Sequence, residues 1–112
     1  MSEKKLEGAD AVLSKIESYP EDFRSIALRL HETIIQTENL SFPRLWYGMP
    51  GYAKSQRGPV LVYFRKDKFI TFGQTENSNI EFADGKPCAV AWYFSELNDQ
   101  VMDHVRKIVR NQ

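Results

Sequence analysis

Residues 60–72, VLVYFRKDKFITF, decide the fold, because two runs of β-branched and aromatic residues flank a short polar break. Val60 to Phe64 and Phe69 to Phe72 favour strands, since these residue types suit a pleated, half-buried surface. The polar residues Arg65 to Lys68 leave room only for a short connection. The stretch therefore predicts a β-hairpin in the middle of the chain.

Three further segments around this hairpin are expected to add strands. Residues 42–54 are expected to form a strand at a sheet edge or an interrupted one, because Pro50 cannot donate a hydrogen bond to a ladder. A weak strand is expected at Ile80 to Phe82, followed by a turn at Asp84-Gly85. Cys88 to Phe94 is expected to be a strand with one large apolar face and one face of small residues, which a helix would approach closely. The short connections imply a mostly antiparallel sheet of about five strands.

The hydrophobic period is helical on both sides of this sheet. Residues 23–34 carry an apolar stripe over three turns and give the strongest helix prediction. A shorter helix is expected over residues 9–18, and Tyr19-Pro20 ends it, because the residue before a proline avoids the α region. Asn98 is a good N-cap for a last helix with its stripe over residues 101–109. The sequence therefore predicts an α+β fold with two N-terminal helices, the sheet, and one C-terminal helix packed on the sheet.

Length and composition limit the class of protein. A chain of 112 residues fits one domain with one core, so residues 1–112 are taken as a single domain with residues 1–8 frayed. The 15 Lys and Arg residues balance the 15 Asp and Glu residues, whereas a nucleic-acid binder normally has surplus cations. Arg106, Lys107 and Arg110 form a local surplus of positive charge. They lie in the last turns of a predicted helix, where cations interact favourably with the helix macrodipole. We expect no nucleic-acid partner, although nucleic-acid binding through this local patch stays the alternative.

The cellular location is also constrained. Cys88 is the only cysteine, which suits a reducing compartment. The charged segment Met1 to Gly8 has no apolar core of a signal peptide, and no apolar run approaches the roughly 20 residues of a membrane span. We therefore expect a cytoplasmic protein without a membrane partner, as a monomer or weak homodimer.

Residues with catalytic potential are few and far apart. His31 and His104 are expected to be partly exposed helix residues, because neither has a His or Cys at ligand spacing. Cys88 is expected to be a small buried hydrophobe, although a histidine brought near it by folding would make it a candidate nucleophile. The chain has no nucleotide-binding or nucleophile-elbow motif. No catalytic residue is therefore assigned, and whether the chain is an enzyme stays open.

Carboxylates crowd the first 22 residues, and such groups can hold a hard cation through their oxygen atoms. They are Glu3, Glu7, Asp10, Glu17, Glu21 and Asp22. Lys4, Lys5 and Lys15 are interleaved with them, a pattern typical of a solvated helix surface. No metal ligand and no cofactor is therefore assigned, and weak metal binding is the alternative.

The segment Phe42 to Lys54, FPRLWYGMPGYAK, has the most unusual composition, with four aromatic residues, two prolines and two glycines. Aromatic side chains beside a kinked strand can line a groove for a ligand. The candidate surface for an unknown protein or small-molecule partner is therefore Trp46, Tyr47, Met49, Pro50 and Tyr52. In the alternative, Trp46 and Tyr47 pack under the helices while residues 48–51 turn a corner.

Tyr19-Pro20 followed by a helix, and then LWYGMPGYAK at residues 45–54, resembles the YdhG-like domains of unknown function, a family of uncharacterised bacterial proteins. Its members carry an aromatic-Gly-x-Pro-x-aromatic signature after two helices, and the resemblance extends from about Ala9 to Val109. It implies an α+β fold similar to that of frataxins, and some relatives are described as frataxin-like iron chaperones. We expect a non-enzymatic binding module; the alternative is an iron-binding chaperone that uses the N-terminal carboxylates.

Overall fold

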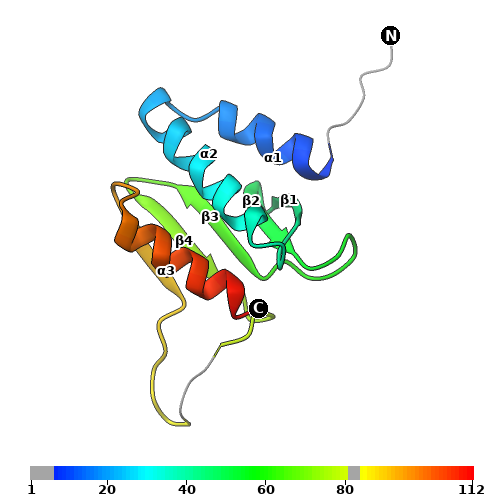
Figure 1. Cartoon of the computed structure of the whole chain (residues 1–112), viewed down its shortest axis with the longest axis vertical. Helices are drawn as coiled ribbons and strands as arrows, with labels where there is room; N and C mark the ends of the chain where they lie inside the picture. Colours follow the sequence, from blue (N-terminus) through cyan, green and yellow to red (C-terminus); the bar gives the residue numbers. More distant parts are fainter. Residues whose placement is uncertain (1–6, 81–83) are drawn as a thin grey trace.

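The computed structural model describes residues 7–80 and 84–112. Within them the elements are α1 (Gly8–Glu17), α2 (Glu21–Gln36), β1 (Phe42–Trp46), β2 (Met49–Ala53), β3 (Val62–Lys66), β4 (Ile70–Gln74), β5 (Ala91–Phe94) and α3 (Asp99–Arg110). The five strands form one antiparallel sheet in the order β1-β2-β3-β4-β5 (Figure 1). The predicted α+β class is confirmed, with two N-terminal helices and one C-terminal helix.

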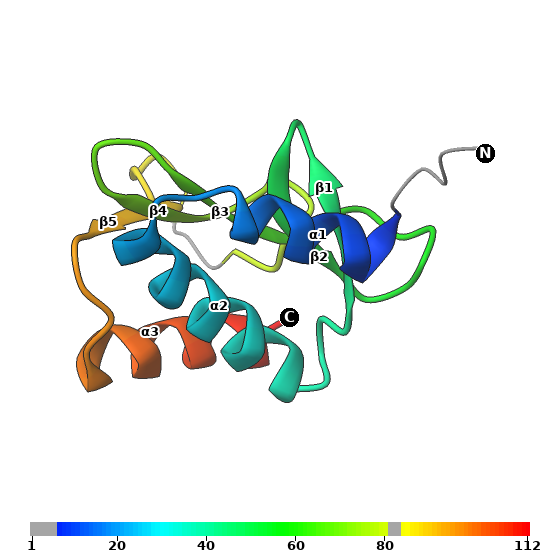
Figure 2. The same cartoon turned by 90° about the horizontal axis from the view of Figure 1, so that it is seen from above.

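The helices lie on one side of this sheet (Figure 2). Helices α2 and α3 pack side by side, and α1 contacts α2 and the strands β1 and β2. The opposite side carries no helix in the described part of the chain, and it is called the open side below.

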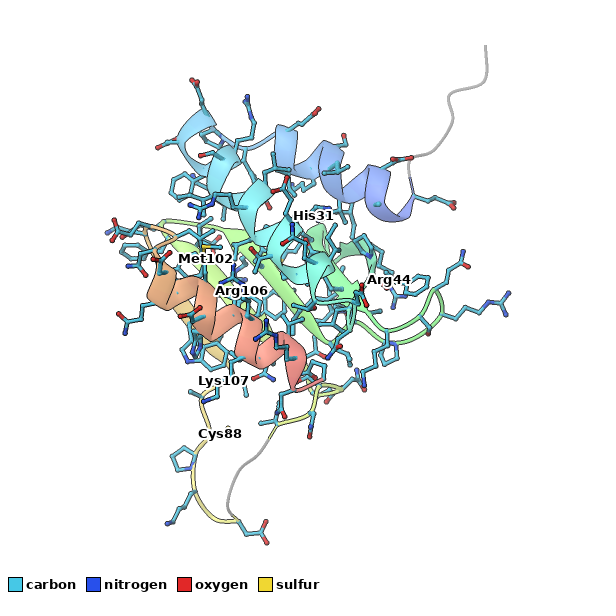
Figure 3. All side chains as sticks on the ribbon, viewed as in Figure 1. His31, Arg44, Cys88, Met102, Arg106 and Lys107 are labelled. Atoms are coloured by element: carbon cyan, nitrogen blue, oxygen red, sulfur yellow. The ribbon has the colours of Figure 1, made fainter. Side chains whose placement is uncertain are left out.

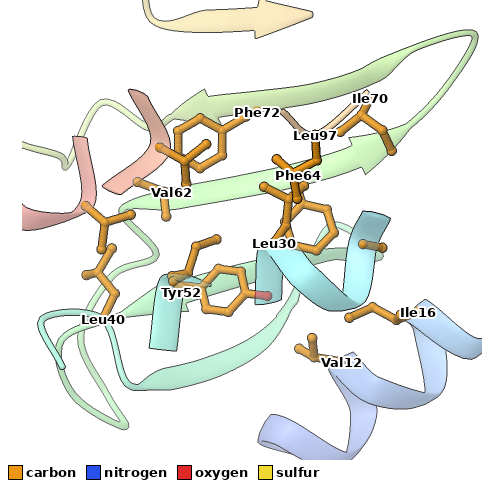
Figure 4. Packing of buried hydrophobic residues seen from close by; sticks show 14 of the residues in the cluster. Val12, Ile16, Leu30, Leu40, Tyr52, Val62, Phe64, Ile70, Phe72 and Leu97 are labelled. Atoms are coloured by element: carbon orange, nitrogen blue, oxygen red, sulfur yellow. The ribbon is translucent and has the colours of Figure 1, made fainter. Parts of the chain in front are cut away.

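Strand alternation sends one set of side chains into the core between sheet and helices. Val62 and Phe64 of β3 and Phe72 of β4 are fully buried there, as is Leu30 of α2, which lies beside Phe64 (Figure 4). Burying a side chain of this size contributes roughly 1.5–3 kcal/mol relative to leaving it exposed. These contacts between the sheet and α2 therefore carry much of the stability.

The helices begin and end close to the residues that the sequence predicts. The side-chain oxygen of Asn98 accepts a hydrogen bond from the Val101 N–H at 2.9 Å, so the predicted N-cap is confirmed. Helix α2 begins at Glu21, and Pro20 occupies the cap position just before it. Buried residues of the predicted stripes, Leu30 in α2 and Val105 in α3, face the core.

The strand predicted over residues 42–54, at a sheet edge or interrupted, is interrupted at Tyr47-Gly48 rather than at Pro50. The segment is a hairpin of β1 and β2, with Trp46 opposite Met49 and a two-residue turn between them. Tyr47 and Gly48 have φ angles of 51° and 76°, and positive values at both positions define the type I′ turns that fit twisted hairpins. Pro50 has a partner residue in β1, but the pairs between β2 and β3 begin only at Gly51. A proline is tolerated here because its missing N–H costs no ladder hydrogen bond on the unpaired β3 side.

The prediction for residues 88–94 is wrong in two respects. Strand β5 covers only Ala91–Phe94, and Cys88 lies before it and is exposed rather than buried. Trp92 and Phe94 pack against the core, while Ala91 and Tyr93 are exposed. The face with small residues thus points away from the helices, because the large apolar side chains fill the space beneath α3.

Two other predictions fall mainly outside the described residues. The weak strand at Ile80 to Phe82 involves residues 81–83, and Ile80 itself belongs to no strand. The frayed segment 1–8 overlaps the described residues only at Glu7 and Gly8, and Gly8 already belongs to α1. Across the described ranges, no helix has both the length and the apolar character that crossing a membrane requires.

Candidate functional site

The open side of the sheet is built around Tyr63. The strand register aligns Gly51, Tyr63, Gly73 and Ala91 in one row across four strands. A Cβ atom added at Gly73 would lie 2.6 Å from the Tyr63 Cζ and Oη atoms. The Tyr63 ring therefore lies down on the sheet over Gly73, where any larger residue would displace it.

Trp46 and Tyr47 continue this aromatic surface onto the β1–β2 hairpin. The ring centroids of Trp46 and Tyr63 are 5.1 Å apart, and Tyr47 meets the Trp46 ring edge-on at 4.7 Å. Trp46 and Tyr63 are half-buried, whereas Tyr47 is 85% exposed. These three residues, Trp46, Tyr47 and Tyr63, are called the aromatic platform.

Tyr47 is both exposed and strained. Its φ of 51° lies in the left-handed region, which costs a bulky residue on the order of 1–3 kcal/mol. Asn, Asp or Gly would occupy this turn position at lower cost. Glu38, the other described non-glycine residue with positive φ, follows the end of α2, where such a conformation commonly terminates a helix. No comparable local reason accounts for a tyrosine at position 47.

A second aromatic pair lies further along the open side. The Phe69 and Tyr93 rings stack with centroids 6.4 Å apart, and Tyr93 is 72% exposed. They border a small cavity of about 210 Å³ that Thr71 also lines. Thr71 is 3% exposed, and its hydroxyl has no hydrogen-bond partner among the described residues. A buried hydroxyl without a partner is uncommon in folded proteins.

The five predicted surface residues do not lie on one surface. Trp46 and Met49 face each other across the hairpin, and Tyr47 forms its tip. Pro50 is buried, and Tyr52 is fully buried in the core, because successive side chains along β2 alternate between the two sides of the sheet. Pro50 and Tyr52 therefore offer a partner no exposed surface. Trp46 and Tyr47 do not pack under the helices, and Tyr63 is the platform residue that sequence reasoning missed.

Tyr52 instead forms a buried hydrogen bond with His31, whose exposed fraction is 4%. The Nδ1 atom of His31 lies 2.8 Å from the Tyr52 hydroxyl. Burial lowers the pKa of His31, with the nearby Glu32 carboxylate acting in the opposite direction. Burial also raises the pKa of Tyr52, and the nearby Tyr19 acts in the same direction. Both groups are thus neutral at pH 7, and the prediction of a partly exposed His31 is wrong.

Cys88 and His104 line the same cavity, which has a volume of about 540 Å³ and lies between α3 and the residues around β5. The Cys88 thiol donates to its neighbouring Ala89 carbonyl at 3.6 Å. The His104 ring packs edge-on against Trp92, with centroids 4.6 Å apart. The contact that fixes the imidazole is therefore with Trp92, and Cys88 receives no catalytic assignment.

The N-terminal carboxylates do not form a described metal site. Within residues 7–80 and 84–112, no three His, Cys, Asp or Glu side chains are grouped so that they could hold a metal ion. Glu7, Asp10 and Glu17 belong to α1 or its start, Glu21 and Asp22 begin α2, and Glu3 lies outside the described residues. No observation in the described chain therefore favours iron.

Comparison with known proteins identifies no relative of this chain. No protein-family model matches the chain, and no curated protein or solved structure matches it. The resemblance to the YdhG-like family stays a prediction, because these comparisons neither support nor contradict it.

Proposed function

We propose that this chain is a non-enzymatic binding domain that contacts a partner protein through the aromatic platform. The observation that carries the proposal is Tyr47, an 85% exposed aromatic residue in a left-handed conformation. Its described ring contact is with Trp46 alone, so the fold gains little from a residue that strains the turn. Backbone strain of this kind concentrates at sites of function.

The composition of the open side supports a protein partner. The few residues that dominate the binding energy of a protein interface are enriched in Trp, Tyr and Arg, and the platform consists of one Trp and two Tyr residues. Arg65 is on the same side, in register with Thr71, and its side chain is 46% exposed while it pairs with Asp67 at 2.8 Å. The Phe69–Tyr93 pair extends the aromatic area beyond Arg65.

The shape of the platform argues against a small-molecule ligand. Sites for such ligands are concave and bury roughly 70–90% of the ligand surface. Tyr47 stands at the tip of a hairpin with most of its surface in solvent, so a small molecule stacked on it would stay exposed. A protein surface can cover the whole platform at once.

Selection from a display library of folded domains and peptides would test this proposal. Binders raised against the whole chain are measured again with Tyr47→Asn and with Leu28→Gln, a control at a 40% exposed position on α2. Loss of an interface anchor costs about 2 kcal/mol or more, which corresponds to about a 30-fold weaker affinity. We expect this loss for Tyr47→Asn and no loss for the control.

Equal affinities for Tyr47→Asn and the unchanged chain would contradict the proposal. Trp46→Leu provides the second arm, because it removes the ring that Tyr47 and Tyr63 both contact. A binder that depends on Leu28 but on neither platform residue would place the interface on the helix side instead.

A further inference from the structure

We propose that the cavity between α3 and β5 binds a small organic anion that carries a carboxylate or phosphate group on a planar ring. This site is separate from the aromatic platform and does not rest on it. Its volume of about 540 Å³ falls within the range of about 300–1,000 Å³ typical of small-molecule sites. Two features of its lining define the ligand, a row of cationic or hydrogen-bonding side chains and an indole wall.

The row comes from one flank of α3. His104, Lys107 and Arg110 follow each other at three-residue spacing, which places them on the same side of a helix, and all three line the cavity. Lys107 extends from α3 on the flank that faces Cys88, the residue on the opposite wall (Figure 3). The described lining includes no Asp or Glu residue. Among the described lining residues, an anion therefore meets the positive charges of Lys107 and Arg110 and no carboxylate.

Neither Lys107 nor Arg110 is neutralised within the described chain. The described ion pairs join Arg65 to Asp67 and Arg106 to Asp103. Arg106, the neighbour of Lys107, thus has its own carboxylate on the surface of α3. The two cations of the cavity are left with their charges available to a ligand.

Capping of the helix end does not require these cations. Side-chain amides occupy the last carbonyl groups of α3, as three donors show: Asn39 Nδ2 to the Val109 and Arg110 carbonyls at 3.2 and 2.9 Å, Gln112 Nε2 to the Ile108 carbonyl at 3.0 Å, and Asn79 Nδ2 to the Asn111 carbonyl at 3.0 Å. The macrodipole favours positive charge at this end of α3 and opposes an anion, so the charges of Lys107 and Arg110 must outweigh it for an anion to bind. Direct hydrogen bonds to the helix end, however, come from uncharged groups.

The indole of Trp92 forms the apolar wall. It stacks with Phe72 at 6.3 Å between centroids, and the His104 ring lies nearly perpendicular to it with centroids 4.6 Å apart, so two neighbours hold its orientation before any ligand binds. Trp92 is half-buried and lines the cavity together with Ile108. A planar ring can pack on this wall while its anionic group reaches the cations, a combination that neither a bare anion nor a neutral ring provides.

Titration of the ¹⁵N-labelled whole chain with phenyl phosphate tests the proposal. We expect saturable shifts of the Trp92 indole N–H and of backbone amides over residues 104–111, with a Kd of about 1 mM or tighter. Benzoate serves as the carboxylate arm, and the tighter of the two probes identifies the anionic group. Inorganic phosphate and phenol are each expected to bind at least about tenfold more weakly than phenyl phosphate, a difference of about 1.4 kcal/mol.

The matched variants remove two positive charges at different places. Lys107→Gln with Arg110→Gln is expected to weaken phenyl phosphate binding at least about tenfold, whereas Lys54→Gln with Arg57→Gln, both exposed in the β2–β3 connection, leaves it unchanged. Equal weakening by both double variants would overturn the proposal, since only net charge would then matter. Inorganic phosphate binding as tightly as phenyl phosphate would also overturn it. Tyr47→Asn changes the aromatic platform and leaves this cavity intact. A failure of the anion-site proposal can therefore be distinguished from a failure of the proposed function.

Discussion

The two sides of the sheet use aromatic residues in opposite ways. On the helix side, Tyr52, Phe64 and Phe72 are fully buried and pack beneath α2 and α3. On the open side, Trp46 and Tyr63 contact each other but keep part of their rings in solvent. The same alternating strands therefore build a core on one side and an accessible surface on the other. The difference separates residues that hold the fold from residues that are available to a partner.

Adjacent residues of β3 give the largest expected difference between the two sides. Phe64→Ala should lower the free energy of unfolding by about 3–5 kcal/mol, because it leaves a cavity in the core. Tyr63→Ala, one residue away on the open side, should lower it by less than half as much, since its ring is half-exposed. Urea unfolding of both variants measures the two values. Equal losses would mean that the open side also acts as a core.

The buried His31–Tyr52 pair should make stability depend on pH. Because burial lowers the pKa of His31 in the folded chain, the unfolded chain binds more protons below the usual histidine pKa of about 6.5. The free energy of unfolding should therefore fall as the pH drops from 7.5 to 5.5, by no more than about 1.4 kcal/mol per pH unit. Urea unfolding at several pH values measures this slope.

His31→Asn should flatten this pH dependence, whereas His104→Asn, an exposed position on α3, should leave most of it. The comparison removes the contribution of carboxylates, which both variants retain. An unchanged slope in His31→Asn would show that the buried pair is not its source.

Gly73→Ala tests whether the Tyr63 ring rests on the open side of the sheet, with a smaller expected change in stability. The added Cβ would lie 2.6 Å from the end of the Tyr63 ring, so the ring must move, while an alanine in a strand gains roughly 0.5–1 kcal/mol over glycine. We expect these effects to leave stability within about 1 kcal/mol of the unchanged chain. The fluorescence of Trp46, measured with Trp92 replaced by Phe, should change as its Tyr63 contact is lost. An unchanged spectrum would mean that Tyr63 does not rest on Gly73.

Much of the fold could be predicted because its periodic signals are long and consistent. The stripe of α2 and the hairpin of residues 60–72 follow directly from spacing and residue type. The β1–β2 hairpin was missed because its turn is Tyr47-Gly48, whereas Asn-Gly or Asp-Gly is the usual type I′ signal. Pro50 then suggested an interruption, although it only lacks a partner on the β3 side.

The site was harder to predict because it depends on which side of the sheet the helices cover. Alternation in β3 separates Tyr63 from Phe64, yet it does not say which of them faces a helix. His31 was judged by metal-ligand spacing, although its position between Ala27 and Ile34 on the α2 stripe indicated burial. The cavity shared by Cys88 and His104 joins residues on either side of β5, and no local pattern links them.

The stability of Tyr47→Asn tests the central claim most directly, because it asks whether the fold or a partner accounts for this residue. Asn accepts the left-handed conformation more readily than Tyr, so the variant should gain up to about 1 kcal/mol in free energy of unfolding. The matched Tyr93→Asn, in regular strand conformation on the same side, should gain nothing. A loss of stability in Tyr47→Asn, or a stability no higher than that of Tyr93→Asn, would contradict the account, since Tyr47 would then serve the fold itself.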